Sequence, residues 1–366
     1  MRLLYWLPQF HPYIGGVEVL ASHFLPALVE RGHEPVVVTS HGALDLPDDD
    51  EWQGVPVHRR PFTASLARGR ADEVADLVAD VAALKRRVAP DVVHVNVTDA
   101  SPFFHLRTRA AHPCPSVVSL RVTVGGGGPA SLLADLLASA DAVTAVSEAA
   151  LAAAVDVTPS TEPRARAILN ALPDPGVADG PPAGGPVLVG AGRLVGDKGF
   201  DLAIRAMPAV RAAHPGAVLR IAGDGPERAD LEGLARELGV IDAVELLGWV
   251  DPERLPAVLA EATVVVVPSR WEEAFGLVAL QAAQVARPVV ATRVGGLPEV
   301  VDHGTTGTLV PVDDVDALAG ALLELLAEPD RAARMGGAAR ARARRVFTFE
   351  RYVDEHLALY EELRDR

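Results

Sequence analysis

Short runs of β-branched and aliphatic residues alternate along the first half of the chain with longer segments in which apolar residues recur every three or four positions. The first pattern is typical of buried parallel strands, and the second of helices that cover a sheet. The short β-branched and aliphatic runs predict strands near 2–7, 35–39, 55–59, 91–95, 116–120, 142–146 and 165–169. Helices are expected between most of these strands, for example at 17–31, 71–88 and 129–139.

The same alternation starts again after residues 173–186, whose sequence PDPGVADGPPAGGP contains five prolines and four glycines and has no periodicity. Such a stretch is typical of a linker. Strands are then predicted near 187–191, 217–222, 243–247, 263–267 and 288–291, with helices near 199–213, 226–238, 252–260 and 276–286. The remaining segments, 313–327, 329–345 and 349–364, are predicted to be entirely helical.

A chain of 366 residues is long enough for two hydrophobic cores. The pattern therefore predicts two α/β domains, at 1–172 and 187–345, separated by the linker at 173–186. The terminal segment 346–366 follows the second sheet, and it is long enough to pack back on the first domain.

Composition narrows the range of functions. The formal net charge of −15 argues against a nucleic-acid partner, which would require an electropositive surface. Cys114 is the only cysteine, so no intrachain disulfide is possible, and a cytoplasmic location is expected. No apolar run approaches the roughly 20 residues of a spanning helix. The arginine-rich run at 331–345 is interpreted mainly as a solvated helix face, so membrane contact would be peripheral at most.

Loops that follow parallel strands are where open α/β sheets bind ligands. Gly15 and Gly16 precede a predicted helix, whose N-terminal N–H groups attract anions; an ordinary strand-to-helix turn is the alternative. In VLVGAGRLVGDKGF at 187–200, Arg193 and Lys198 suit a pyrophosphate.

The same segment also resembles a loosened dinucleotide-binding pattern at Gly190, Gly192 and Gly196, with Asp224 as a ribose partner. A nicotinamide-dependent oxidoreductase is therefore a rival interpretation. The two cations count against it, because a dinucleotide turn binds phosphate through backbone amides. The glycines at 125–128 are interpreted either as a close approach to a ligand or as a mobile surface loop.

The segment 264–301 combines a buried strand, a loop with Glu272 and Glu273, and a helix that starts near Gly276. Gln281 lies eight positions after Glu273, about two turns deeper, so the two side chains can meet different ends of an extended ligand. The N–H groups of Phe275, Gly276 and Leu277 are placed to cap phosphate oxygens. Alternatively, the glutamates only favour the helix N-terminus, and Gln281 is a solvated or capping amide.

Six motifs occur in one order along nearly the whole chain, and together they resemble retaining glycosyltransferase family 4. They are GG-x-E at 15–18, GRL followed by KG at 192–199, GDGP at 223–226, GWV at 248–250, PS with EEAFGL at 268–277 and GGLPE at 295–299. The resemblance implies a GT-B fold, in which two Rossmann-like doubly wound domains face a central cleft. It further implies an acceptor-binding first domain, a nucleotide-sugar-binding second domain, and a C-terminal helix that crosses back to the first.

The resemblance also implies roles for individual residues. Arg193 and Lys198 would hold the donor diphosphate and, with Glu273 on the sugar hydroxyls, form the catalytic set. The segment from Phe275 to Leu277 would lie beside the sugar and phosphates. The base would be cradled by Gly248, Trp249 and Val250, and the loops at Gly15, Gly16 and Gly223 would also contact the donor.

Two positions depart from the family pattern. Gln281 replaces the glutamate that usually accepts hydrogen bonds from the ribose, so charge assistance is lost although one carbonyl acceptor remains. Arg121 stands where many relatives carry a histidine near the reacting carbon, and a guanidinium cannot act as a base. We expect Arg121 to contact an anionic acceptor or a phosphate, with a structural role as the alternative. His94 is the nearest other histidine and is interpreted as structural.

These expectations describe a retaining transferase with a UDP- or GDP-linked sugar as donor and an unidentified sugar, glycolipid or small metabolite as acceptor. No Asp-x-Asp metal motif stands out, and Arg193 and Lys198 already supply positive charge, so no metal and no cofactor apart from the donor substrate is expected. The non-enzymatic alternative is a nucleotide-sugar-binding relative that has lost catalysis.

Overall fold

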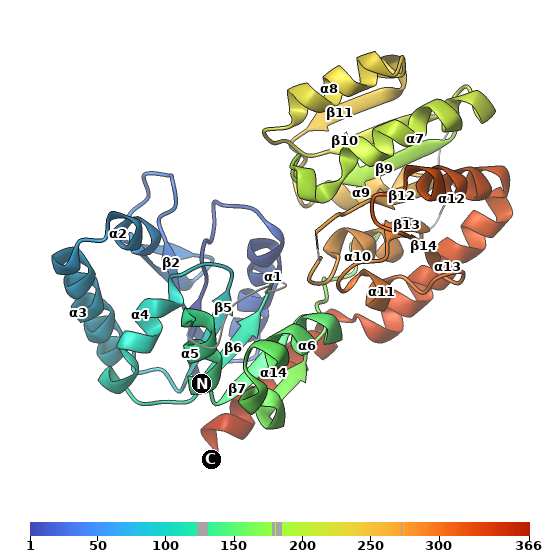
Figure 1. Cartoon of the computed structure of the whole chain (residues 1–366). Helices are drawn as coiled ribbons and strands as arrows, with labels where there is room; N and C mark the ends of the chain where they lie inside the picture. Colours follow the sequence, from blue (N-terminus) through green and yellow to red (C-terminus); the bar gives the residue numbers. More distant parts are fainter. Residues whose placement is uncertain (123–130, 178–179, 181–184, 272) are drawn as a thin grey trace. The chain divides into compact units, whose positions relative to one another are not determined.

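The computed structural model describes residues 1–122, 131–177, 180, 185–271 and 273–366. The chain divides into two compact units (Figure 1). The first contains Met1–Asn170 together with Glu350–Arg366, and the second contains Ala171–Phe349. The terminal helix therefore belongs to the same unit as the beginning of the chain.

The first unit is built on an eight-stranded sheet with the order β3-β4-β2-β1-β5-β6-β7-β8. All neighbouring strands are parallel except β3 and β4, which are antiparallel. The strands are β1 (Arg2–Trp6), β2 (Glu34–Ser40), β3 (Asp49–Trp52), β4 (Val55–Arg60), β5 (Val92–Val97), β6 (Ser116–Leu120), β7 (Ala142–Ala145) and β8 (Ala165–Ala167). All of the strands predicted from the pattern in this half are present, and β3 is an additional edge strand.

The helices of this unit are α1 (Gly16–Glu30), α2 (Phe62–Arg68), α3 (Ala71–Val88), α4 (Pro102–Arg107), α5 (Leu132–Ser139), α6 (Glu148–Val157) and α14 (Phe349–Arg364), with short 3₁₀ turns at Arg109–Ala111 and Pro159–Arg164. The residues that α14 buries recur every three or four positions, which makes one continuous apolar face. Tyr352 packs edge-on against Phe24 of α1, with ring centroids 5.3 Å apart. Tyr360 lies 2.5 Å from His94 Nδ1 in the central strand β5. Residues late in the sequence thus complete the core of the first unit.

The second unit has a six-stranded parallel sheet with the order β11-β10-β9-β12-β13-β14. Its strands are β9 (Val187–Ala191), β10 (Val218–Ala222), β11 (Val244–Gly248), β12 (Val264–Val267), β13 (Val289–Thr292) and β14 (Gly307–Val310). Its helices are α7 (Phe200–Ala213), α8 (Arg228–Glu237), α9 (Leu255–Ala260), α10 (Leu277–Gln284), α11 (Leu297–Val300), α12 (Val315–Ala327) and α13 (Pro329–Val346), with 3₁₀ turns at Gly196–Lys198 and Ile241–Ala243. Helix α7 packs against α12, and α10 packs against α13. The pattern predicted every strand of this sheet except β14.

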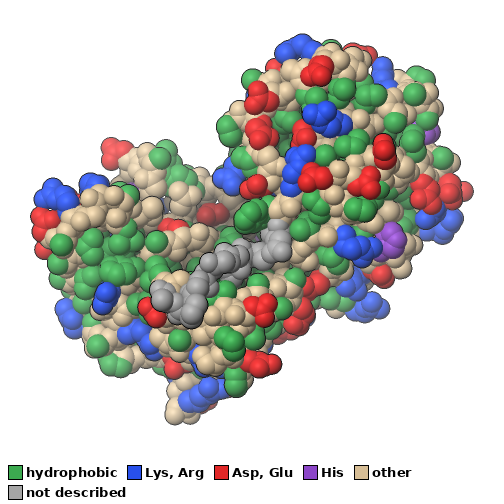
Figure 2. All heavy atoms as spheres, in the orientation of Figure 1, with side chains coloured by type: hydrophobic (Ala, Val, Ile, Leu, Met, Phe, Trp, Pro, Cys, Tyr) green, Lys and Arg blue, Asp and Glu red, His purple; other side chains and the backbone are tan. Residues whose placement is uncertain are grey.

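The arginine-rich helix α13 is more than a solvated face, because several of its guanidinium groups anchor neighbouring segments. Arg340 donates to the carbonyl oxygen of Val177 at 3.1 Å, and Arg342 to that of Glu299 at 2.7 Å. Arg344 pairs with Asp174 at 3.2 Å. Acidic and basic side chains are interspersed over the face of this unit seen in Figure 2. Within the described ranges, no helix is both long and apolar enough to cross a bilayer.

Candidate functional site

The loops at the carboxyl ends of five strands in the second unit are joined by backbone hydrogen bonds in the same order as the strands. Gly223, after β10, donates to Gly248 of β11 at 2.8 Å, and Gly192, after β9, donates to Ala222 at 2.9 Å. Arg270, after β12, donates to the carbonyl of Asp197 at 2.8 Å, and Gly296, after β13, donates to Glu273 at 2.7 Å. The predicted donor-binding residues of this unit therefore share one edge of one sheet, where open α/β sheets bind ligands.

Two glycines permit this close approach. A Cβ atom on Gly199, which has a φ of 65°, would lie 2.0 Å from the carbonyl oxygen of Pro268. A Cβ atom on Gly223 would lie 1.8 Å from the carbonyl oxygen of Gly192. Both distances are far below van der Waals contact, so no side chain fits at either position. The motifs KG and GDGP therefore contain glycines that the packing of neighbouring loops requires.

Lys198 and Glu273 meet at the centre of this edge. The Lys198 ammonium lies 2.6 Å from one oxygen of the Glu273 carboxylate and 3.0 Å from the other. Ser269 donates a hydrogen bond of 3.1 Å to the first of these oxygens. Both charged side chains remain partly exposed, at 31% for Lys198 and 22% for Glu273. The pair thus offers a cation and a hydrogen-bond acceptor at one place that solvent can reach.

Further groups suited to an anion lie in the loops at this edge of the sheet. The Arg193 side chain is exposed, and its guanidinium makes no hydrogen bond with any other described residue. Gly276 is the N-cap of α10, with a φ of 100°. The N–H groups of Phe275, Gly276 and Leu277 donate to no other described residue. The positive end of α10 is therefore available to phosphate oxygens.

Gln281 and Trp249 lie on elements that reach the same edge. Gln281 is nearly buried in α10, and within the described chain its amide makes no side-chain hydrogen bond. Trp249 follows β11 and is 59% exposed, while Val250 is half-buried. An exposed indole at the end of a strand offers a flat face to a planar ring.

In the first unit, Gly15 and Gly16 also follow a strand, β1, and begin α1. A Cβ atom on Gly15 would lie 2.5 Å from a carboxylate oxygen of Glu18. Burial raises the pKa of Glu18. When it is ionised, Glu18 disfavours a second anion at this helix N-terminus, and its raised pKa reduces that effect.

Arg121, which is expected to contact an anionic acceptor or a phosphate, makes its described hydrogen bonds within the first unit. It is buried, and its Nε donates to Asn96 at 2.7 Å, Nη1 to Asn170 at 3.0 Å and Nη2 to the Tyr352 hydroxyl at 3.0 Å. Three of the five guanidinium N–H groups are thus used inside the first unit, which favours the structural alternative, and the contact to an anion stays a prediction. His94 is fully buried between Tyr360 and Ser119, and burial holds its pKa well below the usual value, as suits a structural histidine.

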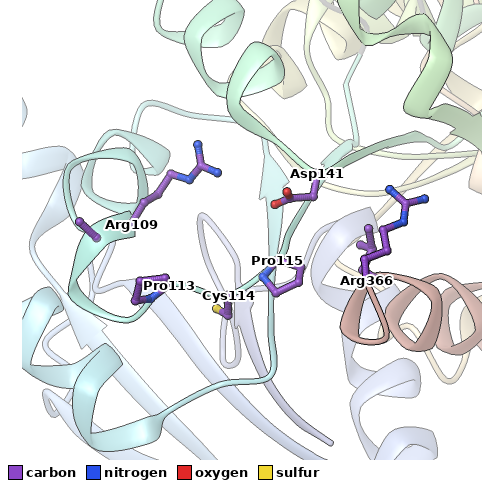
Figure 3. Close-up of a pocket in the computed structure, with 8 residues that line it drawn as sticks. Arg109, Pro113, Cys114, Pro115, Asp141 and Arg366 are labelled. Carbon is purple, nitrogen blue, oxygen red and sulfur yellow. The ribbon is translucent and has the colours of Figure 1, made fainter.

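Another hollow lies in the first unit. It has a volume of about 530 Å³ and is lined by residues that include Arg109, Cys114, Asp141 and Arg366 (Figure 3). Pro115 and Asp141, which also line it, directly precede β6 and β7, so this hollow lies at the amino ends of the strands, opposite to the usual ligand edge. A much smaller hollow, about 20 Å³, lies against Lys198 and Glu273 and has room for about one water molecule.

Some predicted features fall outside the described residues, namely Glu272 and the glycines at 125–128. In the part of the chain that the structure describes, no group of three His, Cys, Asp or Glu side chains is arranged to hold a metal ion. Sequence reasoning placed Ser269 in the motif at 268–277 without a role and missed Arg270; the two residues contact Glu273 and Asp197 respectively. The only signal for Arg270 was its position in the loop after a buried strand.

Comparisons with known proteins agree with this architecture. A family model described as "Glycosyltransferase Family 4" matches residues 14–172, and one described as "Glycosyl transferases group 1" matches residues 178–342. The chain is 44% identical over 161 residues to a GDP-mannose-dependent alpha-(1-6)-phosphatidylinositol monomannoside mannosyltransferase of Mycolicibacterium smegmatis, covering 42% of each chain. It is 40% identical over 176 residues to a glycogen synthase of Mycobacterium tuberculosis, covering 48% of this chain and 42% of the other. The matched region is thus less than half the length of these relatives.

Solved structures resemble the whole chain. The sucrose-phosphate synthase of Thermosynechococcus elongatus has a TM-score of 0.85 at 24% identity, covering 99% of this chain and 98% of the other. Anabaena HepE in complex with UDP has a TM-score of 0.82 at 21% identity, covering 99% and 100%. These likenesses show the GT-B fold. Since one family model matches each half of the chain and both halves take that fold, this chain belongs to the family 4, group 1 glycosyltransferases.

Proposed function

We propose that this protein transfers a sugar from a UDP- or GDP-linked donor to an acceptor hydroxyl, with retention of the anomeric configuration. The observation that carries the proposal is the pairing of Lys198 with Glu273 at the ligand-binding edge of the second sheet. One group suits the diphosphate and the other suits the hydroxyls of the attached sugar. The matched mannosyltransferase is described as GDP-mannose-dependent, and the HepE structure contains UDP, which supports donors of this class.

Charge stabilisation is the chemistry that this edge can supply. Cleavage of the anomeric bond builds negative charge on the departing diphosphate and positive charge on the sugar ring. Lys198, Arg193 and the N–H groups at Gly276 would stabilise the diphosphate, because preorganised cations and amides act most strongly where charge develops. The Glu273 carboxylate would accept hydrogen bonds from the sugar hydroxyls.

The nucleoside would bind through neutral groups. The Gln281 carbonyl would accept a hydrogen bond from a ribose hydroxyl. Trp249, between Gly248 and Val250, would stack on the base. Retention would follow from attack of the acceptor on the face that the diphosphate leaves.

Metal independence is part of the proposal, because two cationic side chains already supply the charge that a divalent ion would bring. Transfer should therefore persist at full rate in excess EDTA. A complete loss of transfer that a divalent ion reverses would overturn this part of the proposal.

Thermal unfolding with a panel of UDP- and GDP-sugars, with NADH as the competitor, tests the donor class. A ligand at 100 times its dissociation constant adds about 2.7 kcal/mol to the free energy of unfolding, so the melting temperature should rise with one nucleotide sugar. Release of free nucleoside diphosphate from that sugar then demonstrates turnover. A rise with NADH alone would favour the oxidoreductase.

The second candidate is a relative that binds the donor without transferring the sugar. It is favoured by the burial of Arg121, at the position where many relatives carry a histidine, and by the amide at Gln281. Tight binding of a nucleotide sugar with neither hydrolysis nor transfer on any acceptor would support this candidate over the enzyme.

A further inference from the structure

Arg270 connects three segments of the second unit. Its Nη1 and Nη2 atoms bind both oxygens of Asp201, at 2.5 and 2.8 Å, and its Nε binds Asp313 at 2.5 Å. Nη1 also donates to the carbonyl of Gly196 at 3.3 Å. Arg270 follows β12, Asp201 is in the first turn of α7, and Asp313 lies between β14 and α12.

The backbone reinforces the same connection. The N–H groups of Arg270 and Trp271 both donate to the carbonyl oxygen of Asp197, at 2.8 and 3.3 Å. Asp197 directly precedes Lys198, and Arg270 directly follows Ser269, the hydrogen-bond donor to Glu273. Arg270 therefore joins the loop that carries Lys198 to the loop that carries Glu273.

We infer that Arg270 is a positioning residue, which holds Lys198 and Glu273 at the mutual spacing needed to bind the diphosphate and the sugar of one donor. The inference rests on the proposed function and adds a residue to it that contacts neither substrate. A guanidinium suits this task, because its planar fork binds a carboxylate at two points while Nε is free for a second partner. Misplacement of a catalytic group by about 1 Å can lower a rate 100-fold.

The chain contains a matched control for this residue. Arg220, in β10, also pairs with two carboxylates, Glu245 at 2.8 Å and Glu261 at 2.7 Å. Its side chain is 29% exposed, against 30% for Arg270. Arg220 makes none of its hydrogen bonds to the loops of the candidate site within the described chain. The two arginines therefore differ mainly in which segments they join, because only Arg270 joins loops of the candidate site.

The test compares Arg270→Lys with Arg220→Lys in the full chain. Lysine keeps the charge but cannot fork, so both variants should lose similar small amounts of melting temperature. We expect Arg270→Lys to lower kcat for the nucleotide sugar at least tenfold, with a smaller change in KM, and Arg220→Lys to leave both constants within about twofold. Affinity for the nucleoside monophosphate, which lacks the β-phosphate and the transferred sugar, should stay within about twofold of the wild type in both variants.

Asp201→Asn weakens the same Arg270–Asp201 contact by changing the carboxylate partner, and it should reproduce the loss of kcat. Equal kcat in Arg270→Lys and Arg220→Lys would overturn the inference and leave the proposed function intact. A fall in kcat accompanied by an equal weakening of monophosphate binding would also overturn it, because it would indicate general damage to the second unit. If the wild type neither binds nor turns over any nucleotide sugar, the proposed function and the inference fail together.

Discussion

Lys198 and Glu273 neutralise each other in this structure, although the proposed reaction assigns them to different parts of one substrate. A diphosphate that binds Lys198 must therefore compete with a carboxylate 2.6 Å from the ammonium. A sugar attached to that diphosphate offsets the loss, because its hydroxyls give Glu273 new donors. The pair thus favours an intact nucleotide sugar over the free nucleotide.

Glu273→Gln should separate the competition of Glu273 with the diphosphate from its hydrogen bonds with the sugar hydroxyls. The variant removes the competing charge, so we expect the free nucleoside diphosphate to bind several-fold more tightly. Transfer should fall at least tenfold, because the amide is a weaker acceptor for the sugar hydroxyls. Calorimetric titration with the diphosphate and a transfer assay measure the two quantities.

Ser269→Ala is the control for that variant. It removes the other hydrogen bond to Glu273, at 3.1 Å, and leaves the charge in place. Its affinity for the diphosphate should match that of the wild type. Weaker diphosphate binding by Glu273→Gln would contradict the competition described here.

Removal of either predicted diphosphate cation should affect turnover far more than stability. Lys198→Ala and Arg193→Ala should each lower kcat by roughly 100- to 1,000-fold, the usual effect of losing one preorganised donor. Arg193 is exposed and makes no described side-chain contact, so its removal should leave the melting temperature unchanged. A large fall in melting temperature for Arg193→Ala would indicate a structural role instead.

Charged residues that lie in a recognisable sequence motif could be predicted as site residues. Lys198 and Glu273 were predicted on separate loops, and the structure brings them into contact. The burial of Arg121 was not predictable, because two of its partners, Asn170 and Tyr352, lie 49 and 231 positions away. Arg270 was missed for a similar reason, since its carboxylate partners follow other strands.

At the scale of elements, close packing of the loops explains why several motifs contain glycine. A side chain at Gly199 has no room beside Pro268, and the positive φ of 65° adds strain for any residue with a Cβ atom. We expect Gly199→Ala to lower the free energy of unfolding by more than about 2 kcal/mol, since it combines a backbone clash with an unfavourable φ. Urea unfolding measures this loss.

Gly233→Ala is the matched comparison within the same unit. Gly233 lies inside α8, and a Cβ atom there would meet nothing within 4 Å. Alanine should stabilise the helix by about 0.5–1 kcal/mol. If both alanine variants changed stability equally, the tight contact at Gly199 would not be the cause.

Most helices and strands were predictable because the apolar positions that recur along the sequence are the positions that the fold buries. The buried strands β9 and β12 and the long helices α3 and α14 end within one or two residues of the prediction. Strand β3 was missed because its sequence, DDEW, has no apolar alternation. It forms an edge strand whose carboxylates Asp49 and Asp50 pair with His58 and Arg59 of β4. Strand β14 was missed because GTLV is short and begins with a glycine packed against β13.

Buried histidines of the first unit make the free energy of unfolding depend on pH. His356 of α14 is fully buried among Phe24, Tyr352 and His94. Burial lowers its pKa to about 3, with the nearby Arg121 charge as a smaller cause. An unfolded histidine titrates near 6.5, so between these values the unfolded chain binds the additional proton.

Stability should therefore fall as the pH drops below about 6.5. The contribution of His356 between pH 7 and pH 5 is about 2 kcal/mol. Urea unfolding of wild type and His356→Phe at both pH values checks this, because phenylalanine keeps the aromatic packing and cannot titrate. The variant should lose about 2 kcal/mol less than the wild type on acidification, and an identical loss would rule out His356 as a source.

Helix α14 also determines the order in which the two units can fold during translation. The first unit needs residues Glu350–Arg366 to cover Phe24 and His94, yet about 180 residues of the second unit are translated in between. At typical elongation rates, the first 170 residues wait roughly 10 to 40 seconds on the ribosome with that apolar surface uncovered. The second unit is one continuous segment, so it needs no later residues and can complete its folding first. A nascent chain of this protein therefore exposes the apolar surface of its first unit to chaperones until α14 has left the exit tunnel.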